Sequence, residues 1–175
     1  MFYSNPQRYK TENSFCLVLV YLVLGQLSLR CCCWLLFSLG SEGGNRMDWI
    51  QLAVNGTLMR GLALEKNLLQ VNGRFVKETR TEKCYRLWSI RDEYPAMVRV
   101  SKEDPQAVQV ELEVWELPGE GLAQVLLQEP PGLCAGKVLL EDGELVLGIL
   151  GEGELLKEGR EISSFGGWRK YRKNQ

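Results

Sequence analysis

The residues of this chain best suited to chemistry gather around a glycine-containing stretch, Gln51–Gly61 (QLAVNGTLMRG). Two glycines there, Gly56 and Gly61, can adopt the positive φ angles that other residues avoid, so successive backbone N–H groups can turn toward one point. Such a group of donors can hold a carboxylate or phosphate. We therefore predict a loop that binds a small anion, made of Asn55, Gly56, Thr57, Leu58, Arg60 and Gly61. An ordinary strand-to-helix turn is the alternative that the loop alone leaves open.

Two charged residues outside the glycine loop, Glu129 and Lys66, are candidates for catalysis. Glu129 ends an expected helix directly before Pro130, where the helix dipole and neighbouring apolar surface would both raise its pKa. A carboxyl group that titrates near neutrality can act as a general acid or base. Lys66, together with Arg60, could supply positive charge to a bound carboxylate. The alternative for Glu129 and for Lys66 is a side chain that simply faces water.

Several other kinds of site are excluded or weakened by the composition. The chain has no histidine, which removes Ser-His and Cys-His nucleophile pairs, the common metalloprotease helix and Cys₂His₂ zinc sites. The stretch Gly132–Val138 (GLCAGKV) resembles a phosphate-binding P-loop, but it is one residue short and ends in valine instead of serine or threonine. We expect no metal and no cofactor. Cys84 and Cys134 are interpreted as reduced core residues, with a disulfide as the alternative.

The chain divides at Met47 into a hydrophobic leader and a globular part. Residues 1–46 include the apolar segment 15–39, which is long enough to span a membrane although it contains Arg30. We expect the leader to be an over-extended reading frame, with synthesis starting at Met47, and a membrane anchor is the alternative. Residues 47–175 carry 17 of the 21 Lys/Arg and 20 of the 22 Asp/Glu. This charge balance predicts that the globular part does not bind nucleic acid. Its length predicts one domain, and the reading of its cysteines as reduced predicts a cytoplasmic protein.

Strand patterns dominate residues 47–175. Ala107–Trp115 alternates apolar residues with a polar face formed by Gln109, Glu111 and Glu113, as in a half-buried strand. Asp142-Gly143 predicts a two-residue hairpin turn with both residues at positive φ. Further strands are expected at 48–54, 74–78, 84–90, 96–100, 137–140 and 144–150, and helices at 62–69 and 119–128.

The C-terminal WRKYRKNQ is interpreted as a solvated tail.

Together the strands and helices predict an α+β domain. Its centre would be a small mixed, strongly curved β-sheet or barrel, accompanied by two or three short helices.

Seven stretches of the globular part resemble one protein family in order. They are VNGTLMRGLAL (54–64), CYRLWSI (84–90), AMVRV (96–100), LEVWELP (112–118), PPGLCAGKV (130–138), ELVLGILGE (144–152) and REISSFGGWRKY (160–171). The family is the C-terminal domain of allophanate hydrolase and its stand-alone relatives, which share the γ-glutamylcyclotransferase-like fold. The resemblance covers Leu52–Tyr171, nearly the whole of the globular part.

The resemblance implies two chemistries. In allophanate hydrolase, an enzyme of urea metabolism, this domain is similar to a decarboxylase that releases CO₂ from the product of a separate amidase domain. In γ-glutamylcyclotransferases the glycine loop binds the substrate and a glutamate deprotonates the attacking amine. Glu129 falls at the position of that glutamate, whereas Val54 replaces the usual tyrosine of the loop and Lys66 stands near the place of a histidine in the allophanate pattern.

Three functional hypotheses follow, and the third is a membrane-tethered form of either of the first two. The first is a small enzyme, of decarboxylase, hydrolase or cyclotransferase type, that acts on a carboxylated amide or carbamate with Glu129 and Lys66 as catalytic residues. The second is a non-catalytic binding or accessory subunit for a separate amidase. The Ser-Ser-Lys machinery of the amidase domain is absent from this sequence, so we expect at most a partial step from this chain alone.

Overall fold

The structure is a computed structural model that describes residues 48–175. The expected start at Met47 and the apolar segment 15–39 lie outside the described residues. Within the described part of the chain, no helix is both long and apolar enough to cross a membrane.

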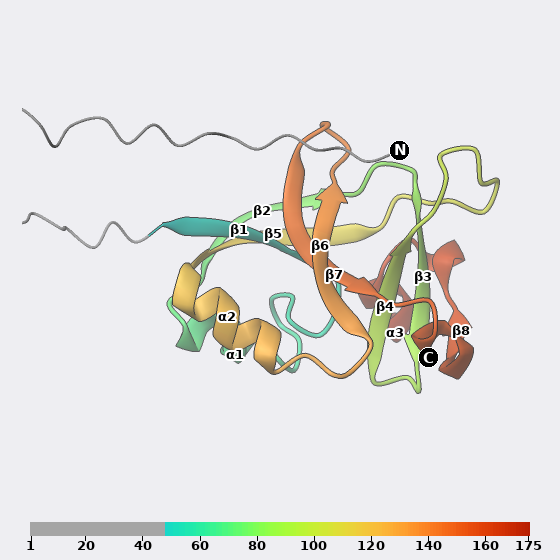
Figure 1. Cartoon of the computed structure of the whole chain (residues 1–175). Helices are drawn as coiled ribbons and strands as arrows, with labels where there is room; N and C mark the ends of the chain where they lie inside the picture. The colour runs from blue at the N-terminus through green and yellow to red at the C-terminus, as the bar shows by residue number, and fades with distance from the viewer. Residues whose placement is uncertain (1–47) are drawn as a thin grey trace, which may run out of the picture. The chain divides into compact units, whose positions relative to one another are not determined.

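The main element of the fold is a five-stranded mixed sheet with the strand order β2-β5-β1-β7-β6. Strand β1 is central and pairs antiparallel with β5, with Leu52 opposite Trp115, and parallel with β7, with Leu52 opposite Leu147. All other neighbours in this sheet are antiparallel (Figure 1). The bounds are β1 (Trp49–Val54), β2 (Arg74–Arg80), β5 (Glu111–Pro118), β6 (Leu133–Leu139) and β7 (Leu145–Gly151).

The two edges of this sheet meet and close it toward a barrel. The edge strand β2 runs into Thr81, which forms a bridge with Leu140 just after the opposite edge strand β6. Two backbone hydrogen bonds flank the bridge, from Glu82 N to Leu139 O at 2.9 Å and from Glu141 N to Arg80 O at 3.0 Å. The predicted strongly curved sheet is thus confirmed, because a flat sheet could not bring its outer strands into contact.

A second, three-stranded antiparallel sheet has the order β4-β3-β8, with β3 (Tyr85–Ile90), β4 (Tyr94–Arg99) and β8 (Gly159–Glu161). A three-residue loop, 91–93, joins β3 to β4, and Arg91 and Asp92 in it have positive φ, at 49° and 58°. The turn is closed by a hydrogen bond from Glu93 N to Ile90 O. It places the start of β4 beside the glycine loop that follows β1.

Three short α-helices and two 3₁₀ turns complete the domain. Helices α1 (Glu65–Gln70) and α2 (Gly119–Leu127) contact each other at one end of the large sheet, whereas α3 (Trp168–Lys173) lies near the three-stranded sheet (Figure 1). The 3₁₀ turns are η1 (Leu155–Glu158) and η2 (Ser163–Phe165). The α+β class with a curved sheet and short helices is therefore confirmed.

Three expected elements differ from the prediction by more than two residues at one end. The strand expected at 137–140 begins at Leu133. The strand expected at 107–115 begins only at Glu111, because Val108 forms a single bridge with Tyr85 before the chain turns into β5. The helix expected at 62–69 begins at Glu65, because residues 56–64 form successive turns instead.

The hairpin between β6 and β7 also differs from the prediction. Its loop has three residues, 141–143, between the paired Leu140 and Glu144, and only Gly143 has positive φ, at 87°. The predicted two-residue turn is wrong. The observed loop is of the three-residue type, in which a tight turn is followed by one glycine in the left-handed conformation.

The C-terminal segment and one cysteine were also misassigned. Trp168 and Tyr171 are each 2% exposed, so the expected solvated tail is a helix packed on the core. Cys84 is buried as predicted, whereas Cys134 is exposed on β6, and both are free thiols. Alternation along β6 places Cys134 on the same face as the buried Val138, so the sequence pattern could not show that this face is uncovered at the start of the strand.

Candidate functional site

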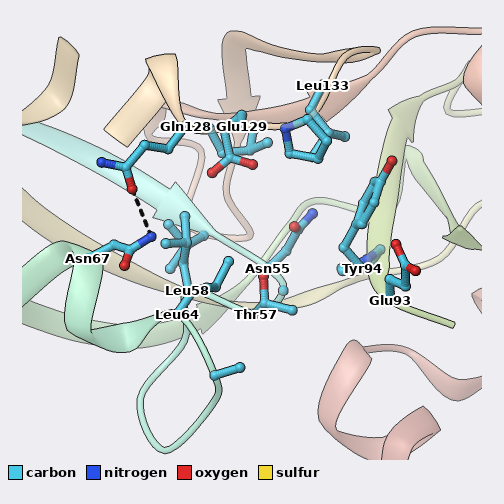
Figure 2. A pocket seen from close by; sticks show the side chains of 16 residues that line it. Asn55, Thr57, Leu58, Leu64, Asn67, Glu93, Tyr94, Gln128, Glu129 and Leu133 are labelled. Atoms are coloured by element: carbon cyan, nitrogen blue, oxygen red, sulfur yellow. Dashed lines mark hydrogen bonds between the residues drawn. The ribbon is translucent and has the colours of Figure 1, made fainter. Parts of the chain in front are cut away.

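A cavity of about 310 Å³ lies where the end of β1, the start of β4 and the end of α2 converge (Figure 2). Its wall is mainly apolar, with a few polar groups, as is typical of sites for small molecules. The lining consists of Val54, Asn55, Gly56, Thr57, Leu58, Ala63, Leu64, Asn67, Glu93, Tyr94, Pro95, Gln128, Glu129, Pro130, Leu133 and Ile149. The structure thus brings the first four predicted loop residues and Glu129 to one cavity.

Asn55 is the one residue of the cavity lining with a buried side-chain polar atom that has no hydrogen-bond partner among residues 48–175. Its side chain is 5% exposed, and its amide nitrogen is buried without a hydrogen-bond partner among the described residues. A buried polar group without a partner costs about 1–3 kcal/mol, so such groups are rare unless something else satisfies them. Figure 2 shows Asn55 and Glu129 extending from opposite walls toward the space between them.

The backbone of the loop adds further donors. The N–H groups of Gly56, Thr57 and Leu58 donate no hydrogen bond within residues 48–175, although these residues are buried or half-buried. The chain turns tightly at this point, with a hydrogen bond of 3.0 Å from Met59 N to Gly56 O. Three successive N–H groups without an acceptor among the described residues could donate to an anion, so the predicted anion-binding role of the loop stays a prediction.

The two loop glycines have different roles from those expected. Gly56 does not have positive φ; it is needed because a Cβ atom there would lie 2.6 Å from Cγ and Cδ of Pro95. Gly61 has the expected positive φ, at 73°, but it is exposed and lies outside the cavity lining. The glycine at the cavity therefore permits close approach of the β3–β4 hairpin, and the second glycine only permits a turn.

Glu129 has the altered acidity that its position predicted. It is half-buried, its carboxylate makes no hydrogen bond to any residue between 48 and 175, and burial raises its pKa to about 7. Helix α2 ends at Leu127, two residues before Glu129. Loss of hydration is therefore the cause of the raised pKa, and the group is poised to gain or lose a proton near neutral pH.

Three predicted site residues lie away from the cavity. Lys66 is exposed on α1, and Arg60 and Gly61 follow the turn that leads out of the loop, so none of the three is among the lining residues. The side chain of Arg60 is directed to Glu113, with 3.2 Å between Nε and Oε1. The positive charge that these residues were expected to supply is therefore not brought to this site.

Several lining residues were not anticipated from the sequence. Tyr94 and Pro95 come from the start of β4, and Asn67 donates a hydrogen bond of 3.0 Å to Gln128, which links α1 to the end of α2 at the edge of the cavity (Figure 2). The one available signal was Pro95, since a proline that begins a strand often marks an edge or a special contact.

A second polar cluster lies beside the loop but outside the cavity. Glu113 was predicted on the solvent face of its strand, yet its side chain is 0% exposed and contacts Arg60 and Arg169. Burial by itself would raise the pKa of Glu113, but hydrogen bonds from Arg169, Arg60 and Trp115 outweigh it and lower the pKa. The prediction failed because β5 lies inside the sheet, between β2 and β1, and both of its faces are covered.

Comparison with known proteins identifies the family of the chain. Residues 50–173 match the model of the allophanate hydrolase C-terminal domain. The chain belongs to the allophanate hydrolase C-terminal domain family. The urea amidolyases of Lachancea kluyveri and Saccharomyces cerevisiae are each 32% identical to it, over 71% and 70% of this chain. The match spans only 7% of the length of either relative.

Solved structures of the family have the same fold. A uropathogenic E. coli-specific protein is 47% identical, with a TM-score of 0.69, and the match covers 74% of this chain and 99% of that protein. The allophanate hydrolase of Kluyveromyces lactis is 27% identical, with a TM-score of 0.68, and the match covers 73% of this chain and 21% of the enzyme. The domain thus occurs both as most of a small protein and as a part of much larger enzymes.

Proposed function

We propose that the cavity binds a small metabolite with a single carboxylate next to an amide or carbamate group, and that Glu129 transfers one proton to or from it. The observation that carries this proposal is the buried, unpartnered amide nitrogen of Asn55 in the same cavity as Glu129. A carboxylate oxygen would satisfy that nitrogen, and Glu129 would face the other end of the ligand.

The loop supplies the binding energy for the carboxylate. The N–H groups of Gly56, Thr57 and Leu58 and the side-chain amide of Asn55 are fixed before the ligand arrives, because Pro95 and the turn at Met59 hold the loop in place. Fixed dipoles in a partly apolar cavity stabilise negative charge without a cost of reorganisation.

The charges of the lining limit the ligand to one carboxylate. Within the described residues the lining contains the carboxyl groups of Glu93 and Glu129 and no lysine or arginine. A second carboxylate on the ligand would lie in a cavity with these two acids and without a counter-charge. The charge balance therefore favours a monoanion over a dicarboxylate.

Glu129 would act through its proton. In a decarboxylation of the kind that the family resemblance implies, the bond between nitrogen and the carboxyl carbon breaks and CO₂ leaves. The electron pair of that bond remains on nitrogen, which takes the proton of the neutral Glu129. The neutral form is well populated near pH 7, because burial raises the pKa of this group to about 7.

A second candidate, transfer of the γ-glutamylcyclotransferase type, is favoured by the placement of Glu129 across the cavity from the loop. There the ionised Glu129 would accept a proton from an attacking amine. The two candidates predict opposite pH profiles, since activity would fall above pH 7 for the proton donor and below pH 7 for the proton acceptor.

Thermal unfolding of the full chain with a panel of small acids tests the binding proposal. A ligand at 100 times its dissociation constant stabilises by about 2.7 kcal/mol, which is several degrees for a domain of this size. We expect the monocarboxylates 5-oxoproline or allophanate to raise the Tm, and malonate, a dicarboxylate, to leave it unchanged. The γ-glutamyl amino acids, which carry two carboxylates and one ammonium group, test the cyclotransferase candidate separately. A Tm unaffected by every monocarboxylate contradicts the proposal.

Variants separate catalysis from binding. Glu129→Gln should retain ligand binding and lose turnover, whereas Gly56→Val should lose both, because its side chain would collide with Pro95. Lys66→Ala tests the sequence-based prediction directly, and from the exposed position of Lys66 we expect unchanged binding. Binding without turnover of any acid in the panel would favour the accessory-subunit hypothesis, with a separate amidase as the partner.

A further inference from the structure

The cluster around Glu113 makes an unusual set of contacts for a residue in a central strand. Its side chain is 0% exposed and accepts four hydrogen bonds. The donors are Arg60 N at 2.9 Å, Arg60 Nε at 3.2 Å, Trp115 Nε1 at 3.0 Å and Arg169 Nη2 at 2.7 Å. Three segments that are distant in the sequence therefore meet at one carboxylate.

One of these contacts and a further hydrogen bond from Arg169 hold the backbone of Arg60 from both sides. Its N–H donates to Glu113, and its carbonyl oxygen accepts a hydrogen bond of 2.6 Å from Nη2 of Arg169. The guanidinium group of Arg60 also lies 3.5 Å from the ring centroid of Phe75. The residue that ends the anion-binding turn is thus fixed by its backbone and by its side chain.

Stability alone does not account for this arrangement. Burying charged groups is costly, and buried ion pairs can often be replaced by apolar residues without loss of stability. Glu113 on β5 and Arg169 on α3 both contact Arg60. This residue lies in the loop just after residues 56–58, whose N–H groups are free within residues 48–175. Conformational specificity of that loop is therefore what the cluster provides.

We propose that Glu113 and Arg169 are positioning residues that clamp the anion-binding loop from outside the cavity. Through Arg169, the C-terminal helix α3 sets how well the N–H groups at the cavity wall are aligned, and hence how tightly a carboxylate binds. This inference rests on the proposed function for its effect on affinity, whereas the ordering of the loop is independent of any ligand.

Residue-resolved amide hydrogen exchange of the full chain without ligand tests the clamp. The amides to follow are Met59, Arg60 and Leu64, which are hydrogen-bonded in the loop. In Arg169→Ala we expect their exchange to accelerate by about tenfold, because the Arg60 carbonyl loses its donor and Glu113 loses a partner. Amides of the β3–β4 hairpin should exchange at the wild-type rate. Lys173→Ala, at an exposed position on the same helix, is the matched control and should change nothing.

Two further variants distinguish loosening of the loop from general unfolding. Glu113→Gln keeps the size of the side chain but removes its charge, and it should give the same selective acceleration in the loop. Arg169→Lys retains a positive donor and should restore part of the protection. Acceleration of all segments together, or a loop that exchanges at the wild-type rate in Arg169→Ala, would overturn the proposal.

The affinity for 5-oxoproline completes the test. We expect the dissociation constant to rise about tenfold in Arg169→Ala, while the pH at which Glu129 titrates stays the same, since Arg169 is not among the residues that line its cavity. An unchanged dissociation constant with a loosened loop would refute the link between the clamp and affinity. If the wild-type chain binds no 5-oxoproline, the proposed function is contradicted for this acid, and the exchange measurement alone decides whether the clamp orders the loop.

Discussion

Replacing Glu129 by glutamine should stabilise the protein at alkaline pH and leave its stability unchanged at acidic pH. Burial raises the pKa of Glu129 from 4.5 to about 7, so the folded state favours the protonated carboxyl group. The stability that this protonated group contributes is fully present below about pH 4.5, the pKa of the unfolded chain. It is lost as the pH rises through 7. Glutamine resembles the protonated form in shape and has no charge to bury.

The magnitude follows from the size of the pKa change. A rise in pKa from 4.5 to about 7 corresponds to at most about 3.5 kcal/mol, since each pKa unit is worth about 1.4 kcal/mol. Water reaches the half-buried side chain, so we expect about 2 kcal/mol, equivalent to about 5–10 °C in Tm for a domain of this size.

Thermal unfolding at pH 5 and pH 8.5 measures this effect. The Tm of Glu129→Gln should exceed that of the wild type by several degrees at pH 8.5 and by far less at pH 5. Glu152→Gln, which changes an exposed glutamate, should follow the wild type at both pH values. An equal difference in Tm at the two pH values would refute the reasoning, because it would show that Glu129 does not titrate between them.

Two further predictions concern backbone positions around the site. Gly56→Ala should destabilise the fold by about 1–3 kcal/mol in chemical denaturation, since its Cβ would lie 2.6 Å from two atoms of Pro95, and it should weaken binding of 5-oxoproline. Gly61→Ala, at φ 73° in open space, should cost about 1 kcal/mol from backbone strain and leave binding intact; equal effects of the two variants on binding would contradict the assignment of Gly56 to the cavity. Hydrogen bonds, first of all from Tyr171, lower the pKa of Asp92 to about 2, so this group stabilises the fold above about pH 4 and loses its contribution as the pH falls toward 2. Asp92→Asn should therefore flatten the acid-unfolding curve between pH 4 and pH 2, and a curve as steep as that of the wild type would rule out this role.

The sequence was sufficient where local pattern decides the structure. Short alternating or apolar runs located every described strand except β8, and the resemblance of seven ordered stretches anticipated the family to which the chain belongs. The expectation that Glu129 would lie beside apolar surface with a raised pKa depended only on its place after an apolar helix and before a proline. Burial does raise the pKa of this half-buried group to about 7, and its catalytic role stays a prediction.

The failures share a physical cause, which is packing between segments that are distant in the sequence. Glu113 has the spacing of a solvent-facing residue, and it is buried because Arg60 and Arg169, from segments distant in the sequence, pack against it. Its partner Arg169 lies in a basic stretch that resembles a solvated tail. Gly56 was singled out for positive φ, whereas the closeness of Pro95, 39 residues later in the numbering, is what requires glycine. The spacing of apolar and polar residues along a strand or helix does not reveal contacts between segments that are distant in the sequence.

The central claim is that the loop and Glu129 form one carboxylate-binding cavity. The most direct test is a series of ¹⁵N-resolved NMR spectra of the full chain, recorded as 5-oxoproline or allophanate is added at pH 6.5. The account predicts that the backbone amides of Gly56, Thr57 and Leu58 and the side-chain amide of Asn55 move most, and that the response is altered in Glu129→Gln. Signals that move only on other elements, or that do not move at all with either acid, would contradict it.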